Sequence, residues 1–267
     1  MRSAAIVTVG SELVEGARID THTAEVARAL APFGFTVREA VSVGDDADAL
    51  AQTFRRLAAV DELVIVTGGL GPTHDDVTRE AAAAALDRPL HRSARLEALL
   101  APAARRHKDA RAAGMVLVQA DVLDGAEVID PTTGTAPGQV VATPAGVMAL
   151  LPGPPAEMRP MLAEFLGRFE RVHASPRELC FAGLGESDVQ VRAQAALGEA
   201  PGIAFTVLAK PGDVRALLFD HGAGASALDA AARRVADAFP EECYSEAGES
   251  LAQVVVRAAR EAGCTLA

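Results

Sequence analysis

The sequence predicts an α/β protein built on a doubly wound, mostly parallel sheet, followed by a smaller α+β domain. Short apolar runs such as Ala4–Val9 and Leu63–Val66 are typical of strands that are buried on both faces. Strands and helical segments alternate three times between Ala4 and Ala85, which favours parallel strands with helices on both faces. The pattern then changes near His173, where a second domain is expected to begin.

The first domain, residues 1–172, is expected to contain the following elements. Strands are predicted at 4–9, 35–42, 63–66, 127–129, 139–143 and 147–151, and helices at 21–30, 45–58, 77–85, 93–106 and 155–169. Asp45 is expected to cap the second of these helices, and Pro155 suits the first turn of the last one. The loops Gly10–Asp20 and Thr67–Asp76 each follow a strand, so both are expected at the carboxyl edge of the sheet, where such folds bind ligands.

The second domain, residues 176–246, is predicted as a β-α-β-β-α-β unit of the split α+β kind. Its strands are expected at 178–181, 205–208, 214–220 and 243–244, and its helices at 185–197 and 226–239. It carries few residues of chemical interest, which favours a scaffolding or dimerisation role. Residues 249–267 are expected to form a separate segment that begins with a helix.

The composition excludes several classes of function. The formal net charge is −11, from 25 basic and 36 acidic residues, with no Trp and one Tyr, which argues against binding nucleic acid. No apolar stretch reaches the length of a membrane span, and the first strand leaves no room for a signal peptide. Cys180, Cys243 and Cys264 are widely spaced and suit a reducing compartment. We therefore expect a cytoplasmic protein without nucleic-acid or membrane partners.

The loop Thr67–Asp76 carries the strongest signal of function. An arrangement of strand, glycine turn and helix directs backbone N–H groups and the positive helix end at an anion. Asp75 and Asp76 add two carboxylates, which would repel a phosphate unless a cation lay between them. The loop therefore predicts a metal–nucleotide site. The alternative is a tight turn in which either aspartate only caps the following helix.

Four motifs together resemble the CinA family, and the resemblance covers the whole chain. They are Val9-Gly10-Ser11-Glu12-Leu13 with Gly16, the segment TGGLGPTHDDVT, GTAPG at 134–138 and LPGPPAEM at 151–158. The resemblance implies a MogA/MoaB-like, molybdopterin-binding-like first domain, a fold shared with an FAD-hydrolysing domain of FAD synthases. It implies a KH-like second domain. It also implies a pyrophosphatase that acts on ADP-ribose-like dinucleotides with a divalent metal ion, and a homodimer that contacts partly through residues after Arg177.

The chain departs from the family pattern at three places. Gly-Ser-Glu-Leu stands where relatives usually have Gly-Thr-Glu-Leu, and His22 stands where they often have Asn. Full-length relatives continue into a nicotinamide mononucleotide deamidase domain. Here Ser250–Gly263 resembles the first helix of that domain and Cys264–Ala267 the start of its strand, so we expect a truncated form of a longer protein.

The predicted reaction is metal-dependent hydrolysis of the pyrophosphate of ADP-ribose or a related dinucleotide. The predicted catalytic residues are Asp75, Asp76 and Glu12, and the predicted ligands of a divalent cation (Mg²⁺, Co²⁺ or Mn²⁺) are Asp75, Asp76, Asp20 and Glu12. The predicted substrate-binding residues are Gly10, Ser11, Thr67, Gly68, Gly69, Gly71, Thr73, Gly134, Thr135, Pro152, Gly153 and Pro154. The metal would activate a water molecule, and one carboxylate or His74 would accept its proton.

Two other functions remain open from the sequence. One is a molybdopterin adenylyltransferase, because the fold and the glycine loop would be shared. The other is a non-catalytic module that binds a nucleotide or pterin and regulates a deamidase domain.

Overall fold

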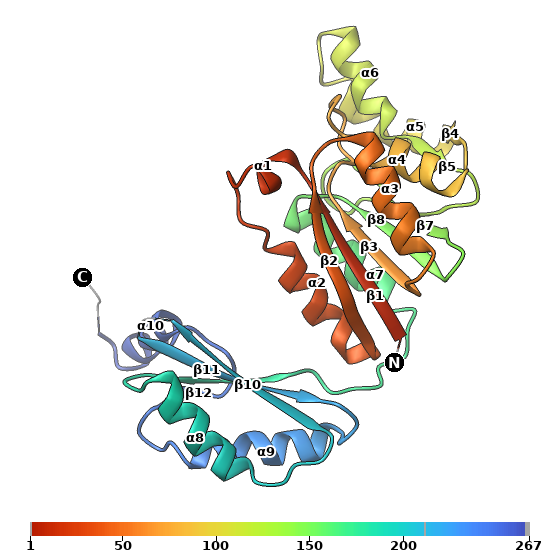
Figure 1. Ribbon diagram of the computed structural model, residues 1–267. Helices are drawn as coiled ribbons and strands as arrows, with labels where there is room; N and C mark the ends of the chain where they lie inside the picture. Colours follow the sequence, from red (N-terminus) through yellow and green to blue (C-terminus); the bar gives the residue numbers. More distant parts are fainter. Residues whose placement is uncertain (1, 211, 265–267) are drawn as a thin grey trace. The chain divides into compact units, whose positions relative to one another are not determined.

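The computed structural model describes residues 2–210 and 212–264. The chain divides between Glu170 and Arg171 into two compact units, whose elements are labelled in Figure 1. No helix in the described part of the chain combines the length and the apolar character that crossing a membrane requires.

The first unit is organised around one six-stranded sheet. Its strands lie in the order β2 (Phe35–Val43), β1 (Arg2–Val9), β3 (Leu63–Thr67), β8 (Val147–Leu151), β7 (Gly138–Ala142) and β6 (Glu127–Ile129). The first four strands run parallel to one another, whereas β7 pairs antiparallel with both β8 and β6. The prediction of a mostly parallel sheet is confirmed.

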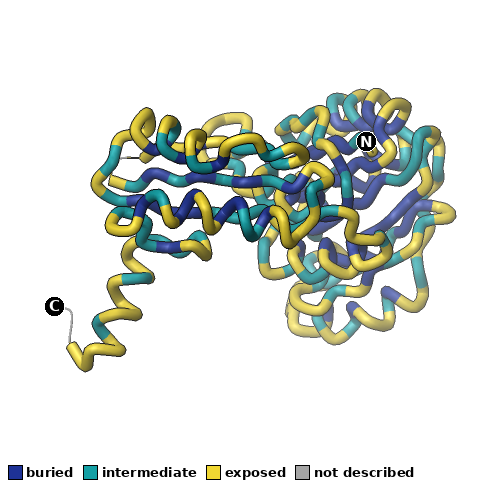
Figure 2. Tube along the Cα trace, turned by 90° about the horizontal axis from the view of Figure 1, so that it is seen from below, coloured by how far each residue is buried: buried dark blue, intermediate teal, exposed yellow. Residues whose placement is uncertain are grey.

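Helices cover both faces of this sheet because side chains of a strand alternate between its faces. On one face Val7 packs in a cluster with residues of α3 (Ala47–Ala58) and α4 (Thr78–Leu86). On the other face Ile6 packs with residues of α2 (His22–Leu30) and α7 (Pro155–Leu166). Strands β1, β3 and β8 are buried along most of their length, in agreement with the dark blue segments inside the unit in Figure 2. Two short helices also belong to this unit: α1 (Ser11–Val14) follows β1, and η1 (Ala31–Phe33) lies between α2 and β2.

The segment between α4 and β6 holds elements that the sequence did not reveal. The helix predicted at 93–106 is α5 (Ala94–Ala104), but a second helix, α6 (Ala110–Val118), follows it. The short strands β4 (Leu90–Arg92) and β5 (Asp121–Leu123) pair antiparallel. Leu96, Leu100, Val116 and Val122 bury one another in a separate small cluster. These strands were missed because His91, Arg92 and Asp121 interrupt the short apolar segments.

The second unit has the predicted α+β order. Its elements are β9 (Arg177–Phe181), α8 (Glu186–Leu197), β10 (Ile203–Lys210), β11 (Asp213–Asp220), α9 (Ala225–Asp237) and β12 (Cys243–Ser245). The antiparallel sheet has the order β10-β11-β9-β12. Leu179, Val189, Leu218 and Leu228 pack in a core between this sheet and its two helices.

Helix α10 (Leu251–Glu261) follows the second unit's sheet. Ser250 and Gln253 form a capping box at its start, as each side chain bonds the other residue's backbone N–H. None of its residues is buried, in agreement with its exposed colouring in Figure 2. Apart from Cys264, the strand predicted at Cys264–Ala267 lies outside the described residues.

Asp220, at the end of β11, organises the turn that precedes α9. Its carboxylate accepts the backbone N–H groups of Ala174, Gly222 and Gly224 at 2.8, 2.9 and 2.9 Å. Burial acts to raise the pKa of Asp220, but these bonds outweigh it and lower the pKa to about 2. The pKa of Asp220 is lower in the folded state than in the unfolded chain. Ionised Asp220 therefore stabilises the fold at any pH above the unfolded-state pKa, and this contribution is lost as the pH falls through the folded-state pKa of about 2.

We therefore predict that Asp220→Asn lowers the free energy of unfolding at neutral pH by on the order of 1–3 kcal/mol, since an amide offers one acceptor oxygen to these N–H groups. The difference from the wild type should shrink as the pH falls from about 4 to about 2. Urea unfolding across this pH range measures it. Asp237→Asn, at the exposed end of α9, is the matched control. A penalty that does not change with pH would contradict the role given to Asp220.

Candidate functional site

A cavity of about 550 Å³ lies at the carboxyl ends of β1 and β3. This volume is in the range of small-molecule sites. Most of the predicted residues line it, namely Gly10, Glu12, Asp20, Thr67, Gly68, Gly69, Gly71, Asp75, Asp76, Thr135, Pro152, Gly153 and Pro154. Three predicted residues do not line the cavity but contact residues that do. Ser11 contacts Asp45, Thr73 contacts Asp76, and Gly134 lies beside Glu157. The structure therefore brings the four predicted motifs to one cavity.

The first two residues of α4 hold four consecutive carbonyl groups of the glycine loop. Thr78 donates its backbone N–H to the carbonyl of Gly69 at 3.2 Å and its hydroxyl to the carbonyl of Gly68 at 2.9 Å. The guanidinium of Arg79 donates to the carbonyls of Leu70 and Gly71 at 2.6 and 3.0 Å. We call these four bonds the carbonyl clamp. The clamp turns the carbonyl groups of residues 68–71 towards α4.

The clamp also sets the direction of the N–H groups. In a trans peptide the C=O and the N–H point in opposite directions, and the described residues contain no cis peptide. The N–H groups of Gly69 and Leu70 therefore point away from Thr78, on the side where these residues line the cavity. Neither N–H has a partner among the described residues. Successive N–H groups aimed at one point form an anion-binding nest.

Two of the predicted amides are not available to a ligand in this arrangement. Gly68 donates its N–H to the carbonyl of Leu151 at 3.0 Å and thereby extends the pairing of β3 with β8. Gly71 donates its N–H to Asp76 at 2.8 Å. The glycines at 68 and 69 are required for their conformation, because their φ angles are 102° and 66°. A side chain at Gly68 would also collide with the carbonyl of Val9.

Asp76 closes the glycine loop and does not cap the helix. One of its oxygens accepts the N–H of Gly71, and the other accepts both the N–H and the hydroxyl of Thr73, at 2.8 and 2.6 Å. The residue that precedes α4 is Val77, which makes no side-chain cap bond. The alternative of a helix cap is therefore wrong for Asp76. Its carboxylate is occupied by the loop's own donors.

Asp20 is occupied in a similar way. Its carboxylate accepts the hydroxyls of Thr8 and Thr23 at 3.2 and 2.5 Å and the backbone N–H groups of His22 and Thr23 at 2.9 and 3.1 Å. Burial acts to raise the pKa of Asp20, but these bonds outweigh it and lower the pKa. Asp20 therefore stays ionised and anchors the start of α2 to β1.

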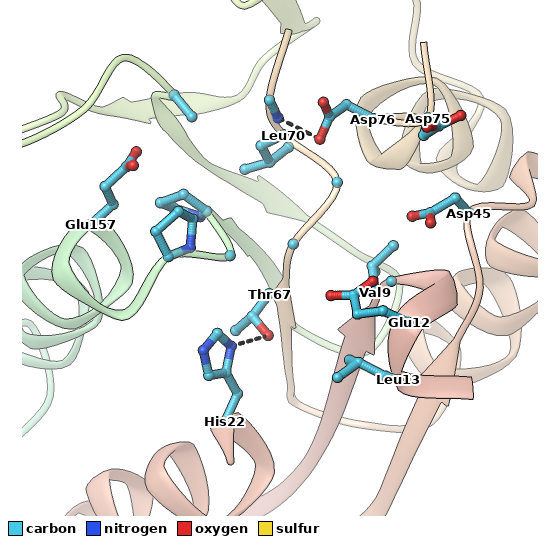
Figure 3. Close-up of a pocket in the computed structure, with 18 of the residues that line it drawn as sticks. Val9, Glu12, Leu13, His22, Asp45, Thr67, Leu70, Asp75, Asp76 and Glu157 are labelled. Carbon is cyan, nitrogen blue, oxygen red and sulfur yellow. Dashed lines mark hydrogen bonds between the residues drawn. The ribbon is translucent and has the colours of Figure 1, made fainter. Parts of the chain in front are cut away.

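His22 faces the cavity beside the end of β3. Its Nδ1 lies 3.1 Å from the hydroxyl of Thr67, an interaction drawn in Figure 3. Burial lowers the pKa of His22, although the charges of Asp20 and Glu25 oppose the shift. The imidazole is therefore neutral at physiological pH and adds no positive charge to the cavity.

Three carboxylates on one side of the glycine loop are less heavily bonded. Glu12, Asp45 and Asp75 lie together on that side in Figure 3. The side chain of Glu12 has no bonding partner among the described residues. Asp45 accepts the N–H of Ser11 at 2.8 Å, while Asp75 pairs with the exposed His74 at 2.8 Å.

The donor set fits a cation that is shared with a ligand. Within the described residues, no three His, Cys, Asp or Glu side chains form a group that could hold a metal ion by themselves. Magnesium usually needs only one or two carboxylates, because substrate phosphates and water complete its octahedron. The predicted set of four protein ligands is therefore not assembled, and Asp20 and Asp76 make other bonds.

The two remaining motifs form the opposite wall. Gly153 packs against the backbone of Gly68, where a Cβ on Gly153 would lie 3.4 Å from the Cα of Gly68. Pro155 begins α7, as predicted, and Glu157 lies in its first turn. The hydroxyl of Thr133 donates to the carbonyl of Ala156 at 2.8 Å and so joins the GTAPG loop to the start of this helix.

Six polar residues that line the cavity were not assigned to the site from the sequence, namely Arg18, Thr21, His22, Asp45, Gln119 and Glu157. Asp45 was assigned to the cap of α3, but Asp46 performs that role by accepting the N–H groups of Asp48 and Ala49. Because two aspartates stand next to each other before α3, the sequence does not show which of them caps the helix. Gln119 follows α6 and reaches the carbonyl of Leu70 from a segment with no motif, so only the tertiary structure identifies it.

Comparisons with known proteins identify the family of the chain. Residues 5–171 match the family described as a probable molybdopterin binding domain. A CinA-like protein from Koribacter versatilis is 37% identical over 94% of the chain, which spans 64% of that relative. A CinA-like protein from Acidobacterium capsulatum is 35% identical over 99% of the chain and 67% of its own length.

Solved structures also resemble this chain. The protein CinA from Thermoplasma acidophilum, described as of unknown function, has a TM-score of 0.56 and 30% identity, covering 62% of this chain and 98% of its own. The chain spans 64% and 62% of the length of two CinA-like relatives, from Koribacter versatilis and Solibacter usitatus. It belongs to the CinA-like proteins, and its first unit is a member of the molybdopterin binding domain family.

Proposed function

We propose that the first unit hydrolyses the pyrophosphate bond of ADP-ribose or a related dinucleotide. The observation that carries this proposal is the pair of unbonded N–H groups at Gly69 and Leu70, which face a cavity that also holds carboxylates. N–H groups fixed in direction stabilise the charge of a phosphate group, and carboxylates alone would repel it. The combination suits a diphosphate that is bound together with a cation.

The diphosphate is placed on the nest of the glycine loop in this proposal. The buried guanidinium of Arg79 lies behind the loop and adds positive charge beneath the phosphate. Asp75 and Asp45, which retain free oxygens, would hold the cation. A divalent cation bound there would neutralise the diphosphate and lower the pKa of a water molecule towards neutrality.

Glu12 is assigned the role of proton acceptor. Its carboxylate lies beside Gly10, lines the cavity and has no partner among the described residues that would compete for its lone pairs. It accepts a proton as the water oxygen attacks a phosphorus atom. The bond between the attacked phosphorus and the bridging oxygen breaks, and the bridging oxygen leaves with the other phosphorus. The products are AMP and ribose 5-phosphate.

Incubation of the purified chain with ADP-ribose and Mg²⁺, Mn²⁺ or Co²⁺ tests the proposal. We predict AMP and ribose 5-phosphate in equal amounts, and a complete loss of turnover in EDTA that excess metal reverses. Saturable binding of ADP-ribose without products would instead favour a non-catalytic binding module. Transfer of an adenylyl group to molybdopterin would favour the adenylyltransferase alternative.

The carbonyl clamp provides a second prediction. Thr78→Val keeps the shape of the side chain but removes the hydroxyl that bonds Gly68, so the carbonyl of Gly68 loses a buried partner. We expect a loss of stability on the order of 1–3 kcal/mol and a drop in ADP-ribose affinity, because the N–H of Gly69 is no longer held in direction. Thr78→Ser, which retains the hydroxyl, should bind as the wild type does. Calorimetric titration of all three proteins measures this, and equal affinities would refute the role of the clamp.

The two adjacent aspartates should respond differently to the same change. Asp76→Asn should lower the melting temperature and turnover together, because an amide cannot accept all three bonds from Gly71 and Thr73. Asp75→Asn should leave the melting temperature unchanged and raise the metal concentration needed for half-maximal turnover, since Asp75 is exposed and its side chain pairs only with the exposed His74. If Asp75→Asn hydrolyses normally at limiting metal, Asp75 is not a ligand.

A further inference from the structure

Glu157 stands at a helix position where a Glu side chain often caps the helix, but it cannot cap α7. It is the third residue of α7, where a Glu side chain commonly accepts the N–H of the N-cap residue. The N-cap residue is Pro154, which has no N–H. Glu157 also forms no ion pair with a cation in the described part of the chain. Its carboxylate lines the cavity instead.

The surroundings of Glu157 hold this carboxylate in place. The backbone N–H of Ala136 faces this carboxylate and acts to lower its pKa. The carboxylate also lies directly against Gly134, where any side chain would collide with it. Since Thr133 is bonded to the start of α7, the loop and the helix carry the carboxylate as one assembly. Burial outweighs the effect of the Ala136 N–H and raises the pKa of Glu157, as expected for a carboxylate that lacks a cation.

Apolar surface adjoins Glu157 on this side of the cavity. Pro152 and Pro154 come from the loop that leads into α7, and Leu70 and Ala136 come from the two glycine-containing loops. In Figure 3, Glu157 lies on the opposite side of the Leu70 segment from Glu12, Asp45 and Asp75. The cavity therefore has one side with the carboxylates of Glu12, Asp45 and Asp75, suited to a cation and phosphates, and another side where Glu157 adjoins apolar residues.

We propose that Glu157 determines base specificity by accepting a hydrogen bond from the exocyclic amino group of an adenine ring, which packs against the prolines. This inference rests on the proposed function, because it places the base of the same dinucleotide. Adenine presents one such amino group at its edge. An ionised carboxylate only accepts hydrogen bonds, and its two oxygens have enough lone pairs to take this amino group together with the Ala136 N–H.

Binding of AMP and of purine riboside 5′-monophosphate tests the proposal. The second ligand keeps the ring and phosphate but lacks the amino group. We expect the wild type to prefer AMP by about tenfold or more, as a hydrogen bond to a charged group contributes on the order of 1.5–3 kcal/mol. In Glu157→Ala the ratio of the affinities for AMP and for purine riboside 5′-monophosphate should fall to about one. In Glu157→Gln it should fall several-fold, because one amide oxygen must serve both the base and Ala136.

Glu164→Gln, on an exposed position of the same helix, is the matched control and should keep the wild-type preference. Equal affinity of the wild type for the two ligands would overturn the proposal without any variant. A preference that is unchanged in folded Glu157→Ala would also overturn it. Because both ligands lack a pyrophosphate, the preference is measured without turnover. Base recognition with no ADP-ribose hydrolysis would refute the proposed function and leave this inference standing.

Discussion

The carbonyl clamp is the interaction on which the site depends. A glycine-rich turn has many accessible conformations, and only one of them aims consecutive N–H groups into the cavity. Thr78 and Arg79 select it by bonding the carbonyls of residues 68–71 from the start of α4. Because these residues belong to a helix packed on the sheet core, the direction of the loop's N–H groups is fixed by the same packing that stabilises the fold.

Arg79 both fixes the direction of the loop carbonyls and adds a positive charge behind the loop. It is 1% exposed, and burial lowers its pKa, but a guanidinium remains protonated at physiological pH. A buried cation usually requires a carboxylate partner, whereas this one is bonded by two loop carbonyls and lies near the charge of Asp76. The cavity thus places fixed positive potential behind the nest and carboxylates in front of it, an arrangement suited to phosphate and a cation together.

The sequence predicted the sheets, their helices and the edge that carries the cavity, because apolar runs and glycine turns are local signals. It did not predict what each polar group does there. Asp76 and Asp20 have the residue type of metal ligands, but nearby N–H and hydroxyl donors occupy them. Gln119 and Glu157 reach the cavity from segments distant from the glycine loop. Which donors satisfy which acceptors depends on the tertiary structure, and no local pattern encodes it.

Amide resonances of the glycine loop provide the most direct test of the central claim, that the N–H groups of Gly69 and Leu70 bind the diphosphate. Inorganic pyrophosphate with Mg²⁺ would be titrated into ¹⁵N-labelled protein. We predict saturable shifts and slowed hydrogen exchange at Gly69 and Leu70, with smaller changes at Gly68 and Gly71, whose N–H groups are already bonded. Saturable shifts elsewhere on the first unit, with Gly69 and Leu70 unaffected, would contradict the account.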